Sequence, residues 1–327
     1  MVTGSGKITY SVGMLVSYVF PVYNEAEGIA DFHQAVLDAV EPLAGTYDLE
    51  FVYVNDGSTD ESLATLTGIA DRDDRVVVVD FSRNYGHQLA ITAGIDFAHG
   101  DAVITMDSDL QDPPAVSVDL VRRWEQGADV VYAQRRSRQD PPLKRLTAHL
   151  YYRTLLRLSA VAIPPDTGDF RLLSRRAADA LREYREASRY VRGMVADVGF
   201  RQEAVVFDRD PRTTGRTSYT WPRMLRLAAD GIIGFSTRPL QFILRTGVVI
   251  AGFSMAVLLY VLGVRLFSPD TAVPGWAFIA TGVFFLGGIQ IAILGVLGAY
   301  IGRIYVESKG RPLYIVRRVI GKAAPWA

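Results

Sequence analysis

The sequence VITMDSDLQDPP occupies residues 103–114 and changes character after its fourth residue. The first four residues favour a buried strand, whereas three carboxylates and two prolines lie in the eight residues after them. Carboxylates this close repel one another unless a cation or several hydrogen-bond donors lie among them. Asp107, Asp109 and Asp112 therefore belong either to a solvated turn or to a metal site at a strand end, and this stretch alone leaves both open.

Four other apolar runs resemble this one, and most of them are separated by segments of helical periodicity. The predicted strands are 15–20, 49–54, 75–80, 102–106 and 129–133, and the clearest predicted helices are 25–43 and 86–99. Runs rich in Val, Ile and Phe that alternate with amphipathic helices are typical of a mainly parallel sheet covered on both faces. The sequence therefore predicts an α/β fold.

Polar residues follow each of the first four predicted strands. In chain order these ends read PVYNE, NDGSTD, FSRN and DSDLQD. The carboxyl ends of parallel strands meet at one edge of a sheet, and ligands of such sheets bind there. Four polar ends at one edge indicate a binding site, and they favour a metal site over a solvated turn for the acidic cluster.

The end of the second predicted strand suits a nucleotide. Asp56, Gly57 and Ser58 form a turn ahead of a helix that Ser58 or Thr59 is expected to cap, so that a carboxylate and backbone N–H groups would meet a base or ribose. A plain capped turn explains these residues too, but not the matching polar end after the first strand. No G-x-G-x-x-G follows the first strand, which disfavours a dinucleotide cofactor.

Composition excludes several other chemistries. The 327 residues contain no cysteine, the four histidines lack zinc-ligand spacing, and no G-x-S-x-G is present. The formal net charge is 0, yet residues 1–120 carry 4 basic and 20 acidic side chains, whereas residues 121–226 carry 22 and 12. The acidic part can hold a cation, and the basic part suits a phosphate or an anionic membrane surface.

Two long uncharged runs, 246–264 and 271–302, lie in the last third of the chain. At about 1.5 Å rise per residue, each run can cross a hydrocarbon core of roughly 30 Å. The connection between them carries one arginine, whereas seven basic residues flank the outer ends of the pair. The positive-inside rule therefore places both outer ends in the cytoplasm.

The domain organisation follows from these features. The predicted parts are an N-terminal extension without a signal-peptide core (1–14), a globular domain (15–217), an interfacial amphipathic helix region (218–240), two transmembrane helices (241–303) and a cytoplasmic tail (304–327). Residues 218–240 also fit a helix that covers the sheet. Because the polar strand ends all lie upstream of Arg238, a fragment ending there is expected to bind nucleotide.

Six blocks of this sequence resemble the polyprenyl-phosphate glycosyltransferases. They are PVYNE, NDGSTD, SRNYGHQLAITAGIDFAHGD, DSDLQDPP, IPPDTGDFRLLSR and LAADGIIGFSTRPL, in this order and ahead of the membrane pair. The resemblance covers roughly residues 15–318. These are family 2 enzymes of the GT-A fold, which is Rossmann-like. The sequence is similar to bactoprenol glucosyltransferases and more distantly to dolichyl-phosphate mannose synthases.

The resemblance implies a role for each residue that matches a family motif. The nucleotide-binding residues would be Pro21, Tyr23, Asn24, Glu25, Asp56 and Asp107, the last nearer the ribose. The metal ligands for Mg²⁺ or Mn²⁺ would be Asp109 and Gln111, and the acceptor phosphate would meet Arg135, Arg138 and Arg171. Asp109 and Asp169 would be the catalytic residues.

The resemblance also implies a reaction. A sugar, expected to be glucose from UDP-glucose, would move with inversion onto undecaprenyl or a related polyprenyl phosphate at the cytoplasmic face of the inner membrane. The second pKa of a phosphate monoester is about 6, so the acceptor is already largely a nucleophile at neutral pH. Whether Asp169 is a base or a positioning residue stays open, as do the sugar, the lipid length and self-association. No nucleic acid is expected as a partner.

Two other functions fit parts of the sequence. A processive polysaccharide synthase would share the nucleotide site, but no Q-x-x-R-W is present, and two membrane spans are few for exporting a polymer. A non-catalytic membrane-anchored nucleotide-binding module is the second alternative. The presence of Asp107, Asp109 and Asp169 argues against it.

Overall fold

The computed structural model describes residues 13–136, 167–187, 189–207 and 275–321, together with a few residues between 243 and 256. These residues fall into two compact units. The first unit comprises the described parts of 1–145, 163–217 and 312–327, and the second those of 146–162 and 218–311. The first unit therefore contains all four polar strand ends and also a segment that follows the long C-terminal helix.

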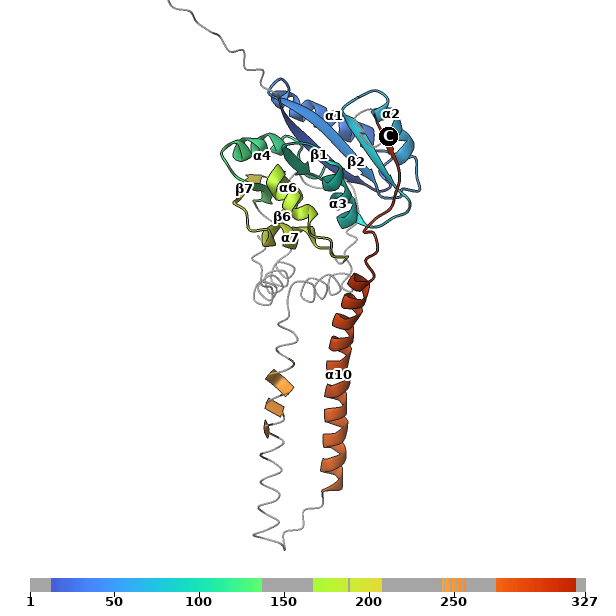
Figure 1. Ribbon diagram of the computed structural model, residues 1–327, viewed down its shortest axis with the longest axis vertical. Coiled ribbons are helices and arrows are strands. Elements are labelled where there is room, and N and C mark those ends of the chain that lie inside the picture. The colour runs from blue at the N-terminus through green and yellow to red at the C-terminus, as the bar shows by residue number, and fades with distance from the viewer. Residues whose placement is uncertain are drawn as a thin grey trace, which may run out of the picture. The chain divides into compact units, whose positions relative to one another are not determined.

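An eight-stranded sheet, counted over the described residues, forms the centre of the first unit (Figure 1). Its strands are β1 (Met14–Val22), β2 (Tyr47–Asn55), β3 (Val76–Phe81), β4 (Ala102–Thr105), β5 (Val130–Arg135), β6 (Thr167–Ser174), β7 (Gln202–Phe207) and β8 (Val316–Ile320). Their order across the sheet is β7-β5-β6-β4-β1-β2-β3-β8. The α/β class and the five predicted strands are confirmed.

The direction of the strands is more mixed than predicted. The central strands β4, β1, β2 and β3 are parallel to one another, and β5 is parallel to β7. However, β6 runs antiparallel between β4 and β5, and β8 runs antiparallel along β3. The prediction of a mainly parallel sheet therefore holds for its centre, and the additional strands make the whole sheet mixed.

Helices cover the sheet with apolar faces. They are α1 (Ile29–Val40), followed by a 3-10 turn (Glu41–Leu43), α2 (Ser62–Ala70), α3 (His87–Phe97), α4 (Val116–Glu125), α6 (Arg175–Arg182) and α7 (Val191–Asp197). In α1, Ile29, Phe32 and Val36 recur at helical spacing and are fully buried. The ring of Phe32 packs edge-on against Phe20 of β1, with 5.0 Å between centroids. α3 packs against β1 and β2, and α4 against β5 and β6.

The register of the central strands brings the polar ends together. Val22 at the end of β1 pairs with Asn55 at the end of β2, and Asn55 pairs in turn with Asp80 of β3. On the other side of β1, Val19 pairs with Thr105, the last residue of β4. The carboxyl ends of these four strands therefore lie along one edge of the sheet, as expected for a binding site.

The outer edge of β3 is covered by β8, which follows the long helix in the chain. Ser82 N donates to Ile315 O at 2.9 Å, and the Tyr314 ring stacks on Phe81 with 5.1 Å between centroids. Arg318 Nε lies 3.4 Å from Asp80 Oδ2. Part of the segment predicted as a cytoplasmic tail is thus an edge strand of the sheet. A fragment ending at Arg238 would lack this strand.

The second unit contains α10 (Trp276–Ser308), a helix of 33 residues. At about 1.5 Å per residue it is about 50 Å long, which exceeds the hydrocarbon thickness of a bilayer. Ile289–Ser308 is the one described segment that is long and apolar enough to cross a membrane, and none of it is buried. The predicted helix at 246–264 lies largely outside the described residues, and the predicted interfacial region at 218–240 lies wholly outside them.

Candidate active site

The loops after β1 and β2 are bonded to each other. Asn24 N donates to Ser58 Oγ at 3.0 Å, Thr59 N donates to Asn24 Oδ1 at 2.9 Å, and Glu25 N donates to Ser62 Oγ at 2.8 Å. Asn24 has a positive φ of 56°, a conformation that asparagine tolerates better than most residues. The expected helix cap is wrong, because α2 begins at Ser62 without a side-chain cap and Ser58 and Thr59 bind Asn24 instead.

Asp56 joins the end of β2 to the loop before α3. Its Oδ1 accepts from Tyr85 N at 2.6 Å and its Oδ2 from Gly86 N at 2.9 Å. Burial raises the pKa of Asp56, although the two N–H donors act in the opposite direction. Gly57 has a φ of +66°, and a Cβ there would lie 2.4 Å from the carbonyl carbon of Arg83, so only glycine fits. The loop that the sequence assigns to a nucleotide is thus fixed closely to its neighbour.

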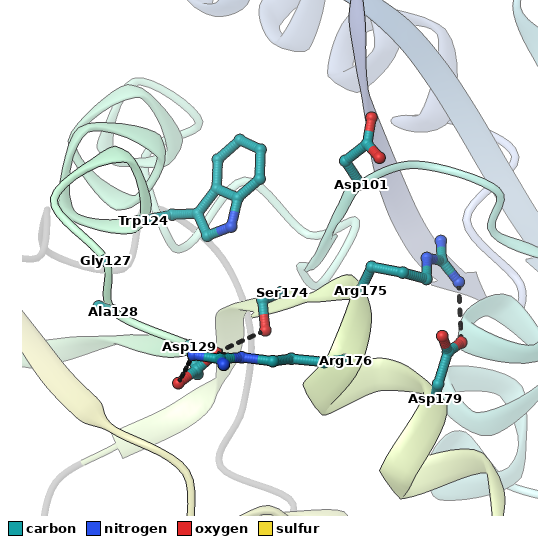
Figure 2. A pocket seen from close by; sticks show the side chains of 9 residues that line it. All are labelled: Asp101, Trp124, Gly127, Ala128, Asp129, Ser174, Arg175, Arg176 and Asp179. Atoms are coloured by element: carbon teal, nitrogen blue, oxygen red, sulfur yellow. Dashed lines mark hydrogen bonds and ion pairs between the residues drawn. The ribbon is translucent and has the colours of Figure 1, made fainter.

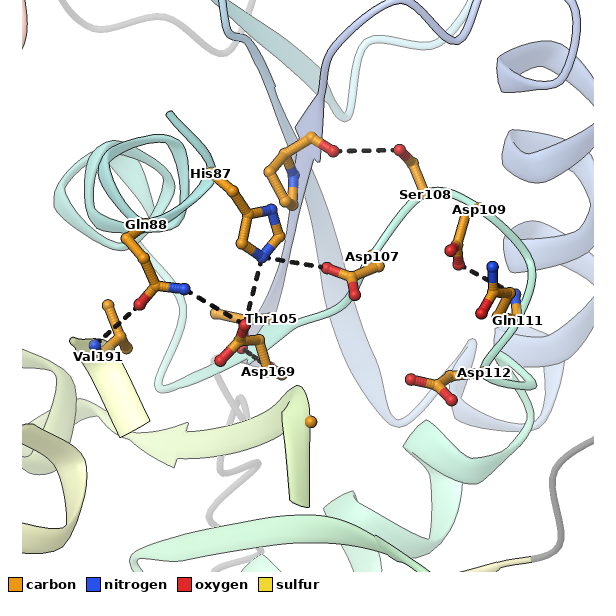
Figure 3. A network of polar contacts seen from close by, with 12 residues as sticks. His87, Gln88, Thr105, Asp107, Ser108, Asp109, Gln111, Asp112, Asp169 and Val191 are labelled. Atoms are coloured by element: carbon orange, nitrogen blue, oxygen red, sulfur yellow. Dashed lines mark hydrogen bonds and ion pairs between the residues drawn. The ribbon is translucent and has the colours of Figure 1, made fainter. Parts of the chain in front are cut away.

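The acidic cluster lies after β4 (Figure 3). Asp107 Oδ1 is buried and has no hydrogen-bond partner, and His87 Nε2 lies 3.4 Å from it. Burial raises the pKa of the Asp107 carboxyl to about 6; His87 lowers it, and the charges of Asp169, Asp109 and Asp112 raise it further. Carboxylates held close together in this way attract a cation.

The cluster fits a metal ion that is shared with a substrate. Asp109 is exposed, and its Oδ1 accepts from Gln111 N at 3.1 Å, across a turn in which Leu110 has a positive φ of 54°. Among the described residues, no three His, Asp or Glu side chains are arranged to hold a metal by themselves. Mg²⁺ is usually held by one or two carboxylates together with substrate phosphates, so Asp109, with Gln111 beside it, fits such an ion.

The ends of β1 and β4 are joined at this site. Ser108 Oγ donates to Pro21 O at 3.0 Å, so the block predicted to bind the nucleotide is bonded directly to the acidic cluster. Tyr23 projects outward beside them and is 47% exposed. Of the residues predicted to contact the nucleotide, Pro21 thus bonds to the loop that carries the predicted metal ligands, and Tyr23 is open to solvent.

Asp169 of β6 is the centre of a second group of contacts. Arg192 of α7 binds it with two hydrogen bonds, Nε–Oδ1 at 2.8 Å and Nη2–Oδ2 at 3.0 Å. His87 Nε2 and Gln88 Nε2 lie 3.2 and 3.3 Å from Oδ2, and Arg171 Nη2 lies 3.7 Å from Oδ1. Burial alone would raise the pKa of Asp169, but His87, Arg192 and Arg171 hold it well below its ordinary value.

His87 connects the two groups, because its Nε2 atom contacts both Asp107 and Asp169 (Figure 3). Burial lowers the pKa of His87, but the two carboxylates outweigh this effect and raise the pKa overall. Burial also lowers the pKa of Arg171 to about 10, against the attraction of Asp169. The site therefore places an acidic end next to a cationic end.

Arg135, predicted to meet an acceptor phosphate, lies beside the acidic cluster. Its Nη2 atom is 3.1 Å from both carboxylate oxygens of Asp112. Gly168 is close to the pair, since a Cβ there would lie 3.7 Å from each side chain. Arg138, predicted for the same role, lies outside the described residues.

Comparison with known proteins adds the family. A model of Glycosyl transferase family 2 matches residues 17–182, which include the acidic cluster and Asp169. The chain belongs to glycosyltransferase family 2. The enzyme is 42% identical to the uncharacterized glycosyltransferase YkcC of Bacillus subtilis (strain 168), over 93% of this chain and 94% of the relative. It is 38% identical to the prophage bactoprenol glucosyl transferase homolog of Escherichia coli (strain K12), over 94% and 99%.

The solved structures that resemble this glycosyltransferase are more distant. The mannosyltransferase PcManGT from Pyrobaculum calidifontis, solved in complex with GDP-Man and Mn²⁺, has a TM-score of 0.46 and 15% identity over 89% of this chain and 88% of that one. The relation to bactoprenol glucosyl transferases thus rests on the sequence comparison. The mixed α/β sheet agrees with the GT-A fold that the resemblance implies.

Sequence reasoning misses three residues that the structure brings to the candidate site. His87 and Gln88 lie in a block that carries the resemblance, but the resemblance implies no role for them. Arg192 cannot be recognised from the sequence, because a single arginine in a basic region is typical of an ordinary surface charge. A useful clue was available for the first two, since polar residues at the start of a helix that follows a strand end face the ligand edge of such a sheet.

A cavity of about 440 Å³ lies at the opposite edge of the sheet (Figure 2). It is lined by Asp101, Trp124, Gly127, Ala128, Asp129, Ser174, Arg175, Arg176 and Asp179. Arg176 is paired with Asp129, and Arg175 Nη1 lies 3.3 Å from Asp179 Oδ1. This cavity is at the amino ends of β4 and β5, away from the polar strand ends.

Proposed function

We propose that this glycosyltransferase moves glucose from UDP-glucose onto undecaprenyl or a related polyprenyl phosphate at the cytoplasmic face of the membrane, with inversion at the anomeric carbon. One observation carries the proposal. His87 Nε2 lies 3.4 Å from Asp107 and 3.2 Å from Asp169, so the acidic end and the cationic end of the site are one side chain apart. A metal-bound diphosphate and an anionic acceptor need this arrangement. Near full-length similarity to a bactoprenol glucosyl transferase homolog supports the choice of sugar and lipid.

The acidic end would bind the donor. Asp109 and Gln111 would hold Mg²⁺ or Mn²⁺, which supplies positive charge to neutralise the diphosphate leaving group. Asp107 would lie near the ribose, and Asp56 with the block Pro21, Tyr23, Asn24 and Glu25 would meet the base. The hydrogen bond from Ser108 to Pro21 O supports this division, because it keeps the base and metal halves at a fixed separation.

The cationic end would bind the acceptor. An oxygen of the lipid phosphate forms a bond to the anomeric carbon while the bond from that carbon to the diphosphate oxygen breaks, and the electron pair leaves with the nucleoside diphosphate. An acceptor dianion has no proton to lose in this step. It needs cations that overcome its repulsion from the donor diphosphate, a role that suits the arginines of the site, Arg135, Arg138 and Arg171 among them.

Attachment to a membrane explains the rest of the chain. A polyprenyl phosphate stays in the bilayer, so an enzyme held there meets its acceptor at high effective concentration. The candidate membrane segment in α10 supports this arrangement. The predicted interfacial region at 218–240 and the helix at 246–264 complete the proposal, with the catalytic domain in the cytoplasm.

A panel assay tests the proposed function. Membranes containing the enzyme are incubated with undecaprenyl phosphate and each of several nucleotide sugars, and the lipid product is identified by mass spectrometry. UDP-glucose is expected to give a glucosyl phosphate lipid, and NMR of the product is expected to show the inverted anomer. Membranes containing Asp109→Asn serve as the control. A polymeric product, or no lipid product with any donor, contradicts the proposal.

A further inference from the structure

Donors from three side chains surround the Asp169 carboxylate, and most of them lie on one of its oxygens. A carboxylate has about four lone-pair sites. Arg192 takes two of them with its contacts of 2.8 and 3.0 Å, and His87 and Gln88 approach Oδ2 at 3.2 and 3.3 Å. A general base must bring an oxygen within about 2.6–3.2 Å of the proton that it removes. Three of these donors lie within 3.3 Å of Oδ2, which leaves that oxygen no room for a substrate proton. Oδ1 accepts from Arg192 Nε and lies 3.7 Å from Arg171 Nη2, so a proton approaching it would have to come close to two guanidinium groups.

The exposed fractions of the Asp169 and Arg192 side chains also argue against Asp169 as the proton acceptor. The Asp169 side chain is 4% exposed, whereas the Arg192 side chain that binds it is 32% exposed. The guanidinium is therefore more accessible to a ligand than the carboxylate is. Two arginines and His87 surround this single carboxylate, so the group as a whole attracts an anion.

We propose that Arg192 binds the phosphate of the acceptor and that Asp169 is a positioning residue that holds Arg192 in place rather than a proton acceptor. This inference rests on the proposed function, since it concerns the lipid phosphate of that reaction. It extends the set of acceptor residues to α7, in which no residue matches a family motif.

A contact between helices fixes the geometry of this pair. Gln88 donates to Asp169 through Nε2 and accepts from Val191 N through Oε1 at 2.9 Å. The start of α3 is thereby tied to the start of α7, next to Arg192. The position of the guanidinium is thus determined from both sides, by the carboxylate that it binds and by the helix that carries it.

A double-mutant cycle on the full-length enzyme in membranes tests the inference. The variants are Arg192→Ala, Asp169→Asn and the double variant, with Arg192→Lys as the conservative change. Arg201→Ala is the matched control, because Arg201 forms an exposed ion pair with Glu203 outside the site. Steady-state kcat and KM are measured for donor and acceptor. Binding of undecaprenyl phosphate without donor is measured by native mass spectrometry, and the Tm of each variant verifies folding.

Arg192→Ala is expected to raise the KM for acceptor about tenfold or more while the KM for donor changes little, because a charge-assisted contact to the lipid phosphate is lost. Arg192→Lys is expected to recover only part of the loss, since lysine cannot make the two-point contact with Asp169. The double variant is expected to be about as slow as Asp169→Asn alone. Asp169→Asn already releases the guanidinium from its position, so removing that guanidinium as well causes little further loss.

Two results overturn the inference. One is a folded Arg192→Ala variant whose KM and binding affinity for acceptor are unchanged. The other is a double variant whose fold loss of activity equals the product of the losses in the two single variants. Failure of the proposed function looks different, because the parent enzyme itself would then neither bind undecaprenyl phosphate nor form a lipid product.

Discussion

His87 Nε2 lies 3.4 Å from the buried Oδ1 atom of Asp107, and this oxygen has no hydrogen bond. The contact partly compensates a carboxylate whose pKa is raised to about 6 by burial and by neighbouring acidic groups. A divalent ion next to Asp107 and Asp109 would supply the missing positive charge. The protonation of Asp107 and the binding of metal are therefore expected to compete.

This competition predicts a pH dependence. As pH falls below about 6, Asp107 becomes protonated and the affinity for Mn²⁺ with UDP is expected to fall, by up to about tenfold per pH unit if one proton is displaced. Calorimetry between pH 5 and 8 in buffers of different ionisation enthalpy measures the affinity and the protons released. Asp107→Asn is expected to flatten the pH dependence. An equally steep decline in that variant would assign the titration to another group.

The raised pKa of Asp107 has the opposite consequence for the metal-free protein, because the contribution of Asp107 to its stability is expected to rise as pH falls. The pKa of Asp107 in the folded state exceeds the ordinary value of 3.8, so the folded chain binds the proton more tightly than the unfolded chain. The contribution of Asp107 to stability therefore increases as pH falls from about 6 towards 4. Asp107→Asn is expected to have a higher Tm than the parent at pH 7, and this difference is expected to shrink at pH 5. A pH-independent difference between the two Tm values would contradict the assignment.

Asp109→Asn is expected to abolish transfer while leaving the fold intact, because Asp109 is exposed and its loss removes a metal ligand but little packing. EDTA is expected to have the same effect on the parent enzyme. Asp119→Asn is the matched control, since Asp119 is an exposed aspartate that pairs with Arg122 on α4. Activity at the parent rate without a divalent ion would refute the metal assignment.

Asp169→Asn is expected to be slower than the parent by a similar factor at every pH from 5 to 9. Its neighbours hold the pKa of Asp169 well below the ordinary value, so the carboxylate has no affinity for a proton in this range. A variant that lacks a true base would recover relative to the parent as pH rises through about 6, where the acceptor phosphate loses its second proton without help. Profiles of kcat and acceptor KM against pH distinguish the two cases. Recovery of most of the activity at high pH with an unchanged acceptor KM would make Asp169 the base.

Asp56→Ala is expected to weaken UDP binding and to destabilise the fold. The change leaves the N–H groups of Tyr85 and Gly86 without their acceptor, and each such loss typically costs about 1–3 kcal/mol when the group is buried. Asp56→Asn keeps one acceptor oxygen and is expected to be intermediate. Tm and the Kd for UDP are measured for each variant. Asp48→Ala is the control, because Asp48 is an exposed aspartate on β2, the strand that precedes Asp56. An unchanged Tm would mean that the loop before α3 is held by other contacts.

The central part of the fold could be predicted from the sequence because of its burial. β1, β2 and β3 are covered on both faces, so they appear as continuous apolar runs that no other element imitates. β6 and β8 lack this signal. β6 contains two charged residues, Asp169 and Arg171, and the carboxylate of Asp169 is compensated by partners distant in sequence. β8 is a short edge strand with two arginines. Their assignment required the pairing partners that only the structure supplies.

The candidate site was predictable to the extent that it lies at strand ends. The acidic cluster and Asp56 were found because each follows an apolar run directly. The partners of Asp169 were not, because His87 is 82 residues away in the chain and Arg192 lies on another helix. A long-range ion pair leaves no local pattern, so residues that act through such pairs are the ones that sequence reasoning misses.

The order of the elements along the chain adds a consequence for biosynthesis. β8 is translated after α10, yet it pairs with β3, and its Arg318 lies 3.4 Å from Asp80, which in turn accepts a hydrogen bond from Asn55 beside Asp56. Until the ribosome has made residues 316–320, β3 has an unpaired edge and Asp80 lacks this cation. The candidate nucleotide side of the sheet is therefore finished only after the candidate membrane segment has been synthesised. Completion of the sheet is thus delayed until that segment has had the opportunity to insert into a bilayer.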